Sequence, residues 1–266
     1  MASAHDNNAP PVQVRHEARV AWLTINRPQA RNALDPPTVH ALLAAVETLA
    51  ADHDTRVLVF TGAGDRAFCA GADIKAMRGM DVAAGAAWTR LGHRLMDAVA
   101  AVPQPTIAAL NGVAAGGGCE LALACDLRLM AEGARIGQPE VLLGVIPGWG
   151  GTQRLARLVG PGVAKELLYT GRLLEAPEAL SCGIVHAVHP ESRLLAEAQE
   201  MAERLAAQAP LALAAIKQAV DAGADADLAQ ANQIEIALFD RVFASTDREE
   251  GMMAFVDRRP PRFTGA

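Results

Sequence analysis

The 266-residue sequence has few aromatic residues, no run of basic residues and no long apolar stretch. Phe, Trp and Tyr make up 4% of it and the net charge is −6, so we expect no nucleic-acid partner, whose recognition needs a basic surface and stacking rings. No apolar run approaches the roughly 20 residues that span a membrane. Residues 1–11 lack the apolar core of a signal peptide and are predicted to be disordered. These absences predict a cytoplasmic protein with no membrane partner.

Signatures of metal centres and of several hydrolase classes are also missing. None of the four cysteines belongs to a CxxC pair, and no histidine stands at zinc-finger spacing from them, so they are interpreted as reduced, small apolar side chains. The absence of G-x-S-x-G, H-E-x-x-H and P-loop motifs leaves serine hydrolases, zinc peptidases and nucleoside triphosphatases without support. We therefore predict neither a metal nor a cofactor.

Short β-type runs alternate with helical stretches until about residue 190, and the remainder is almost purely helical. This alternation predicts an α/β fold, with β–β–α units around a mostly parallel core over residues 12–190 and a helical C-terminal region over 191–266. The apolar side chains of the last two helices pack either on the chain's own core or on another subunit. The expected strands are 19–25, 56–61, 106–110 and 126–130, and the expected helices are 36–51 (with Asp35 as N-cap), 84–101, 119–124, 210–222, 228–244 and 247–256.

Residues 62–67, Gly-Ala-Gly-Asp-Arg-Ala, follow a strand and fit the dinucleotide-binding pattern G-x-G-x-x-A. That pattern must run into a helix whose N-terminus holds a pyrophosphate. The residues after it, 68–72, have no helical period and contain a glycine. We therefore predict that 63–72 is a plain loop rather than a nucleotide site.

Two turns rich in small residues are candidate binding sites. Residues 70–75, Ala-Gly-Ala-Asp-Ile-Lys, lead into a predicted helix, and their small side chains let a ligand approach backbone N–H groups; a purely structural turn is the alternative. The run Gly116-Gly117-Gly118 joins a strand end to a helix start. Free N–H groups at such a helix N-terminus form a natural oxyanion site, although tight packing of the helix on a strand would also require glycines.

Two glutamates stand in apolar surroundings. Glu120 lies in the first turn of a helix otherwise made of Cys, Leu and Ala, where a buried carboxylate is costly without a partner or a task. Complementing the helix dipole is its alternative role. Glu140 is the only acid of an apolar, glycine-rich stretch, and capping after Pro139 is its alternative role. If the two carboxyl groups converge, desolvation and repulsion raise the pKa of at least one, which suits acid–base chemistry.

Together these segments resemble the enoyl-CoA hydratase/isomerase, or crotonase, family. The resemblance covers roughly residues 12–263 in one order. It is highly specific for the family and less specific for the reaction, because the family hosts several reactions on one scaffold. The matching stretches are IAALNGVAAGGGCELALACDLRLMAEGARIGQPEVLLGVIPGWGGTQRLARLVG (107–160), NRPQARNAL (26–34), FCAGADIKAM (68–77) and DREEGMMAFVDRRPPRF (247–263).

The resemblance implies a crotonase-like superhelix of β–β–α units whose helical C-terminal region forms a homotrimer or a dimer of trimers. It implies an acyl-CoA substrate whose thioester oxygen meets the backbone N–H groups of Ala72 and Gly117. It assigns Glu140 chiefly to proton transfer at the α-carbon and Glu120 to orienting and activating a water molecule. The substrate-binding residues that it implies are Ala70, Ala72, Asp73, Ile74, Lys75, Gly117, Gly148 and Trp149.

The presence of both acids favours one reaction of the family, the reversible syn addition of water to a trans-2-enoyl-CoA, which gives a 3-hydroxyacyl-CoA. Family isomerases, which shift a double bond, usually lack one of the two acids and are the alternative. Some family members bind RNA, which the net charge of −6 argues against here. Trp149 stands where many relatives carry a small residue, so we expect its indole to shorten the acyl pocket.

Overall fold

A computed structural model describes residues 9–266. Of the segment predicted to be disordered, residues 1–8 lie outside the described residues. The described chain is tied down from its start, because Asn26 donates hydrogen bonds from its side chain to the Pro10 carbonyl and from its backbone to the Pro11 carbonyl, at 3.2 and 2.8 Å. Within residues 9–266 no helix combines the length and the apolarity that crossing a bilayer requires.

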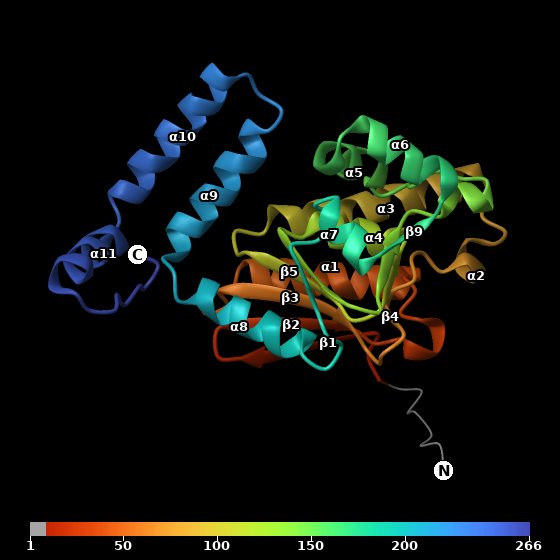
Figure 1. Cartoon of the computed structure of the whole chain (residues 1–266), viewed down its shortest axis with the longest axis horizontal. Coiled ribbons are helices and arrows are strands. Elements are labelled where there is room, and N and C mark those ends of the chain that lie inside the picture. The colour runs from red at the N-terminus through yellow and green to blue at the C-terminus, as the bar shows by residue number, and fades with distance from the viewer. Residues whose placement is uncertain (1–8) are drawn as a thin grey trace, which may run out of the picture.

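The strands and helices follow one another in a repeating order (Figure 1). The strands are β1 (Val12–Glu17), β2 (Val20–Ile25), β3 (Val57–Gly62), β4 (Ala67–Cys69), β5 (Thr106–Leu110), β6 (Val113–Ala115), β7 (Leu127–Ala131), β8 (Arg135–Gly137), β9 (Leu173–Glu175) and β10 (Ala187–His189). The helices are α1 (Pro36–Ala50), α2 (Ile74–Met77), α3 (Val82–Ala101), α4 (Gly117–Ala124), α5 (Gly151–Val159), α6 (Pro161–Thr170), α7 (Ala176–Ser181), α8 (Leu194–Ala206), α9 (Pro210–Gly223), α10 (Leu228–Phe243) and α11 (Thr246–Asp257), with 3-10 turns η1 (Pro28–Ala30) and η2 (Glu140–Leu143).

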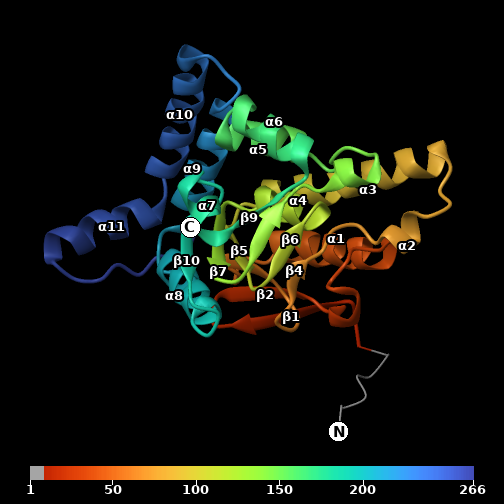
Figure 2. The ribbon, with the colours of Figure 1, turned by 45° about the vertical axis from the view of Figure 1, so that its right-hand side comes forward.

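Consecutive β–β–α units build two sheets at once. In the units that begin with β3, β5 and β7, the first strand joins a six-stranded sheet of order β1-β2-β3-β5-β7-β10, and the second joins a four-stranded sheet of order β4-β6-β8-β9. Thus β3, β5 and β7 are parallel neighbours in the first sheet, and β4, β6 and β8 are parallel neighbours in the second. The chain therefore climbs as a superhelix (Figure 2), which confirms the predicted fold class.

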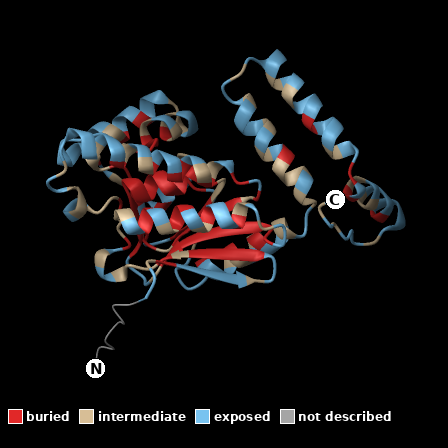
Figure 3. Ribbon diagram, turned by 180° about the vertical axis from the view of Figure 1, so that it is seen from behind, coloured by how far each residue is buried: buried red, intermediate tan, exposed pale blue. Residues whose placement is uncertain are grey.

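Helix α4 forms the centre of the core. All of its residues are buried, and it contacts β4 and β6 on one side and α3 and α5 on others. Strands β3 and β5 are also buried along their whole length, which explains their continuous apolar sequence. Helix α8 covers β2, β3, β5 and β7 from the far side of the large sheet. The buried residues consequently gather in the sheets and α4 (Figure 3).

The last three helices leave this core. Helices α9 and α10 form a hairpin and α11 turns away from it, so that all three project from the sheets in both views (Figures 1 and 2). Their surface is largely exposed (Figure 3) and includes large apolar side chains such as Phe239, Phe255 and Val256. The three C-terminal helices predicted from the sequence are therefore present, and α8 precedes them as a further helix that belongs to the packing of the sheets.

Two predictions of local structure are wrong in detail. Residues 63–72 are not a plain loop throughout, because 67–69 form the short strand β4 beside β6. The absence of a helix after Gly62 does confirm that the dinucleotide pattern is misleading there. The helix predicted to start at Cys119 starts two residues earlier, at Gly117, because the glycine run itself supplies its first turn.

Candidate active site

A cavity of about 750 Å³ opens between the start of α4, the α2–α3 segment and the loop that leads from η2 to α5. It contains the residues that the sequence singled out on separate segments. Ala70, Ala72 and Ile74 line it from the first turn, Gly116, Gly117 and Glu120 from the glycine run, and Glu140, Gly148 and Trp149 from the third segment. The superhelix brings these segments together because equivalent positions of successive units stack on one another.

The backbone amides of Ala72 and Gly117 lie side by side in this cavity. A Cβ atom added at Gly117 would come within 3.3 Å of the Ala72 nitrogen. Leu34 bridges the flanking residues, because its amide donates to the Gly71 carbonyl and its carbonyl accepts from Asp73, both at 2.8 Å. The Ala72 amide, which lies between these two groups, therefore points away from Leu34. Among residues 9–266 neither the Ala72 amide nor the Gly117 amide has an intramolecular acceptor.

A glycine with positive φ precedes each of these amides. Gly71 has φ +101° and Gly116 has φ +53°, a conformation that other residues rarely adopt. Space is also short, since a Cβ at Gly71 would lie 2.8 Å from the Ala115 carbonyl oxygen and one at Gly116 would lie 2.9 Å from Glu140 Oε1. The packing alternative for the glycine run is confirmed at its third residue, because a Cβ at Gly118 would collide with the Cys69 carbonyl of β4.

Glu120 is 2% exposed and is held by a backbone turn. Its Oε1 accepts hydrogen bonds from the amides of Trp149 at 2.7 Å and Gly151 at 2.8 Å. Burial raises the pKa of Glu120, while these two hydrogen bonds and the charge of Arg154 act in the opposite direction. The carboxylate is thus more than a complement to the α4 dipole, because it is the acceptor around which the loop before α5 folds.

Glu140 sits in a different environment in the same cavity. Burial and, to a lesser extent, the nearby charge of Glu120 together raise its pKa to about 7, against the opposing effect of its own backbone hydrogen bond. The amide of Gln138, oriented to satisfy its hydrogen bonds, donates to both carboxylate oxygens of Glu140 at 3.2 and 2.9 Å. The two carboxyl groups share this cavity, and the pKa of Glu140 is raised to near neutrality, as acid–base chemistry requires.

Two of the residues predicted to bind substrate do not line the cavity. The Asp73 side chain caps α2 by accepting from the Lys75 amide at 3.0 Å, and it pairs with Arg27 at 3.2 Å. Lys75 is exposed on α2 beside the rim. The structure thus gives Asp73 a capping role and places Lys75 outside the enclosed volume.

Trp149 is a buried wall of the cavity, 3% exposed. Its indole meets Trp88 of α3 edge to face, with ring centroids 4.9 Å apart. It fills the space over two glycines, because a Cβ at Gly92 would collide with the indole nitrogen and one at Gly117 would lie 2.6 Å from Cζ3. The side chain therefore lies between α3 and α4, where it bounds the cavity.

Several residues that line the cavity are not among the binding or catalytic residues predicted from the sequence. Trp88, Thr89 and His93 come from α3, Leu143 ends η2, and Val145 and Ile146 come from the exposed apolar loop after η2. The sequence shows that α3 has a helical face. It does not show which other elements of the fold that face contacts. Gln138, a polar residue two positions before Glu140, is the one signal in the sequence that points to a partner of this carboxyl group.

Comparisons with known proteins show which family the chain belongs to. The family model described as enoyl-CoA hydratase/isomerase matches residues 15–266. The chain belongs to the enoyl-CoA hydratase/isomerase family. Among its relatives in this family, crotonyl-CoA hydratase of Syntrophomonas wolfei is 43% identical over 93% of this chain and 95% of that protein. Short-chain-enoyl-CoA hydratase of Clostridium acetobutylicum is 41% identical over the same shares.

A solved member of the family has the same fold. The crystal structure of enoyl-CoA hydratase from Bacillus anthracis matches with a TM-score of 0.94 at 40% identity, covering 96% of this chain and 100% of that one. The coverage includes both the β–β–α core and the projecting helices. Membership of the enoyl-CoA hydratase/isomerase family confirms the resemblance seen in the sequence motifs.

Proposed function

We propose that this protein is an enoyl-CoA hydratase, which adds water reversibly and syn to a trans-2-enoyl-CoA and forms a 3-hydroxyacyl-CoA. The observation that carries the proposal is a single cavity that holds Glu120, Glu140 and the paired amides of Ala72 and Gly117. The names of two relatives, crotonyl-CoA hydratase and short-chain-enoyl-CoA hydratase, support the same reaction.

The amides of Ala72 and Gly117 would hold the thioester oxygen. Addition of water at C3 moves negative charge onto that oxygen, so the two donors stabilise the transition state more than the neutral ground state. The Gly117 amide also stands at the N-terminus of α4, where the helix dipole is positive. Removing one such donor in other enzymes costs roughly 2.7–4 kcal/mol.

The surroundings of the two carboxyl groups suggest their roles. Glu120 accepts two backbone hydrogen bonds, which favour its ionised form, whereas Glu140 has its pKa raised to about 7 and is protonated below that pH. We assign Glu120 as the base that takes a proton from water as the oxygen bonds to C3. We assign Glu140 as the acid that gives its proton to C2. The pair carries one proton throughout, so dehydration uses the same groups in exchanged roles.

The walls of the cavity favour a short acyl chain. Trp149 and Trp88 close it on the α3 side, and both rings are almost fully buried. Ala70 and Ile74 line the side toward α2, where the exposed Lys75 stands beside the rim. We propose that the coenzyme A portion leaves the cavity along this rim and that a crotonyl-sized acyl group fills the enclosed end.

The test is hydration of crotonyl-CoA by the purified protein, followed as loss of the conjugated-enoyl absorbance. A panel of longer trans-2-enoyl-CoA esters should be hydrated more slowly. A 3-enoyl-CoA, which gains this absorbance on isomerisation, tests the alternative. Isomerisation without hydration would overturn the proposal. Turnover should also survive exhaustive chelation, because the proposed step uses no metal; loss restored by a single metal would contradict this.

We also propose that the protein works as a homotrimer or a dimer of trimers. The support is the exposed apolar surface of α10 and α11, where Phe239, Phe255 and Val256 are 62%, 87% and 78% exposed. Side chains of this kind are normally covered in a working protein. Light scattering of the active protein should give a trimer or hexamer mass, and a fully active monomer would contradict it. A cytoplasmic location stays a prediction.

A further inference from the structure

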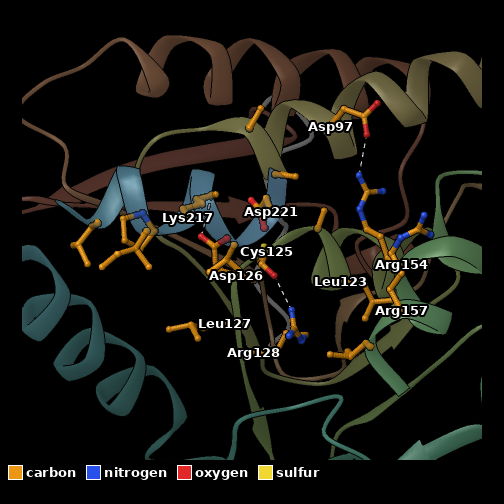
Figure 4. A pocket seen from close by; sticks show the side chains of 18 of the residues that line it. Asp97, Leu123, Cys125, Asp126, Leu127, Arg128, Arg154, Arg157, Lys217 and Asp221 are labelled. Carbon is orange, nitrogen blue, oxygen red and sulfur yellow. Dashed lines mark hydrogen bonds and ion pairs between the residues drawn. The ribbon is translucent and has the colours of Figure 1, made fainter. Parts of the chain in front are cut away.

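Arg154 lies directly behind the turn that binds Glu120. It belongs to α5, and its Nη1 donates to the Trp149 carbonyl oxygen at 3.2 Å. Its Nη2 pairs with Asp97 of α3 at 2.8 Å, as Figure 4 shows. A Cβ added at Gly150, which has φ +102°, would collide with Nη1. The guanidinium therefore rests on the backbone of the turn.

Arg154 and Glu120 hold opposite sides of the same three residues. The amides of Trp149 and Gly151 point to Glu120 Oε1, while the carbonyl of Trp149 points to Arg154. Any shift of this turn moves the two donors that orient the carboxylate. Arg154 itself is not among the residues that line the candidate active site. It lines a second cavity of about 790 Å³, together with Asp97 and Arg157 (Figure 4).

We propose that Arg154 is a positioning residue for the hydration reaction, which holds the turn at 149–151 around Glu120 and keeps that carboxylate ionised beside Glu140. The inference rests on the proposed function, because it assigns Glu120 the role of base. Arg154 acts through Glu120 and touches no reacting atom.

Few charged groups surround Glu120. Glu140 reaches it from η2, Arg154 stands behind it on α5, and His93 of α3 lines the same cavity. Cys119 of α4 is neutral, because burial raises the pKa of its thiol well above the ordinary value. Burial also raises the pKa of Glu120, and the charge of Arg154 opposes this effect. Without the charge of Arg154, the proton shared by the two glutamates would be found on Glu120, the proposed base, in a larger fraction of the molecules.

The ion pair with Asp97 does not by itself explain why an arginine stands at position 154. The Asp97 side chain is 68% exposed, and exposed pairs contribute little to stability. Arg157 offers a matched control. It lies on the same helix, lines the same second cavity and pairs with the exposed Asp225 at 3.2 Å, but its other contacts are to Gln153 rather than to the turn.

The experiment compares Arg154→Gln, Arg154→Lys and Arg157→Gln by the pH dependence of kcat for crotonyl-CoA. Arg154→Gln should move the acid limb to higher pH and lower kcat on that side on the order of tenfold, with KM little changed, since only part of the general-base contribution is lost. Arg154→Lys should restore most of the profile, and Arg157→Gln should match the unchanged protein. A purely structural Arg154 would lower the amount of folded protein and leave the profile in place, which would overturn the proposal.

A second measurement does not depend on turnover. Infrared spectra during a pH titration report the protonated carboxyl of Glu120, assigned by its disappearance in Glu120→Gln. In Arg154→Gln this band should appear at higher pH than in the unchanged protein, and an unchanged titration would refute the inference. An unchanged protein that fails to hydrate crotonyl-CoA would refute the proposed function, while the infrared comparison would still decide the role of Arg154. If Arg154→Gln does not fold, Arg154→Met removes the charge and retains an apolar stem.

Discussion

Replacing Glu120 or Glu140 by glutamine tests the proton transfers of the proposed mechanism directly. At position 120 the amide oxygen can still accept from Trp149 and Gly151, which now bond Oε1 at 2.7 and 2.8 Å, so the turn before α5 should stay in place. At position 140 the change retains the shape of the side chain beside Gln138. Both substitutions therefore remove proton transfer with little change in packing.

The expected losses follow from the two separate proton transfers. General acid or base help is worth about 10²–10⁴-fold, so Glu120→Gln and Glu140→Gln should each lower kcat by at least about a hundredfold. KM should change modestly, because the amides of Ala72 and Gly117 still meet the thioester oxygen. The double variant should lose much less than the product of the single losses, since groups that act as one unit are not additive.

The assay is the hydration of crotonyl-CoA, together with exchange of the C2 proton of bound substrate with solvent. Glu140→Gln should impair this exchange, because Glu140 is assigned to C2. Glu132→Gln, at an exposed position after β7, is the matched control and should leave both rates unchanged. Near-normal hydration in Glu120→Gln, with complete loss in Glu140→Gln, would refute the paired mechanism and favour the single acid of an isomerase.

Three further predictions address the pH dependence, the acyl wall and the glycine turn. Hydration should decline as pH rises through about 7, because Glu140 then loses the proton that it must deliver to C2; a profile flat across this range would contradict the assignment. Trp149→Ala should raise kcat/KM for long enoyl chains more than for crotonyl-CoA, by roughly 1–3 kcal/mol per methylene admitted, and should lower the free energy of unfolding by about 3–5 kcal/mol; equal effects at all chain lengths would show that the indole does not limit the acyl chain. Gly116→Ala should abolish hydration, because its Cβ would lie 2.9 Å from Glu140 Oε1, whereas Gly183→Ala, which also has a positive φ (+73°) but open space around it, should lower only stability.

Local features of the chain were readable because short-range physics decides them. Asp35 before Pro36 predicts a helix start, and the Asp35 side chain does accept from the Thr38 amide at 3.0 Å. Continuous apolar runs predict the buried strands β3 and β5. The strands β4, β6 and β8 escaped detection because each has three residues, too few to display a period, and each exists only by pairing with the next unit of the superhelix.

The sequence by itself determined the family, the alternation of strands and helices, and the two glutamates and glycine turns to which we assign the chemistry. Each of these depends on residue types at fixed spacing. Only the tertiary structure decided which groups share a cavity. Asp73 and Trp149 belong to equally plausible motifs, yet one caps α2 beside Arg27 and the other separates α3 from α4. The different surroundings of Glu120 and Glu140 likewise arise from amides and charges distant in the chain, because burial and electrostatic fields depend on distance in space.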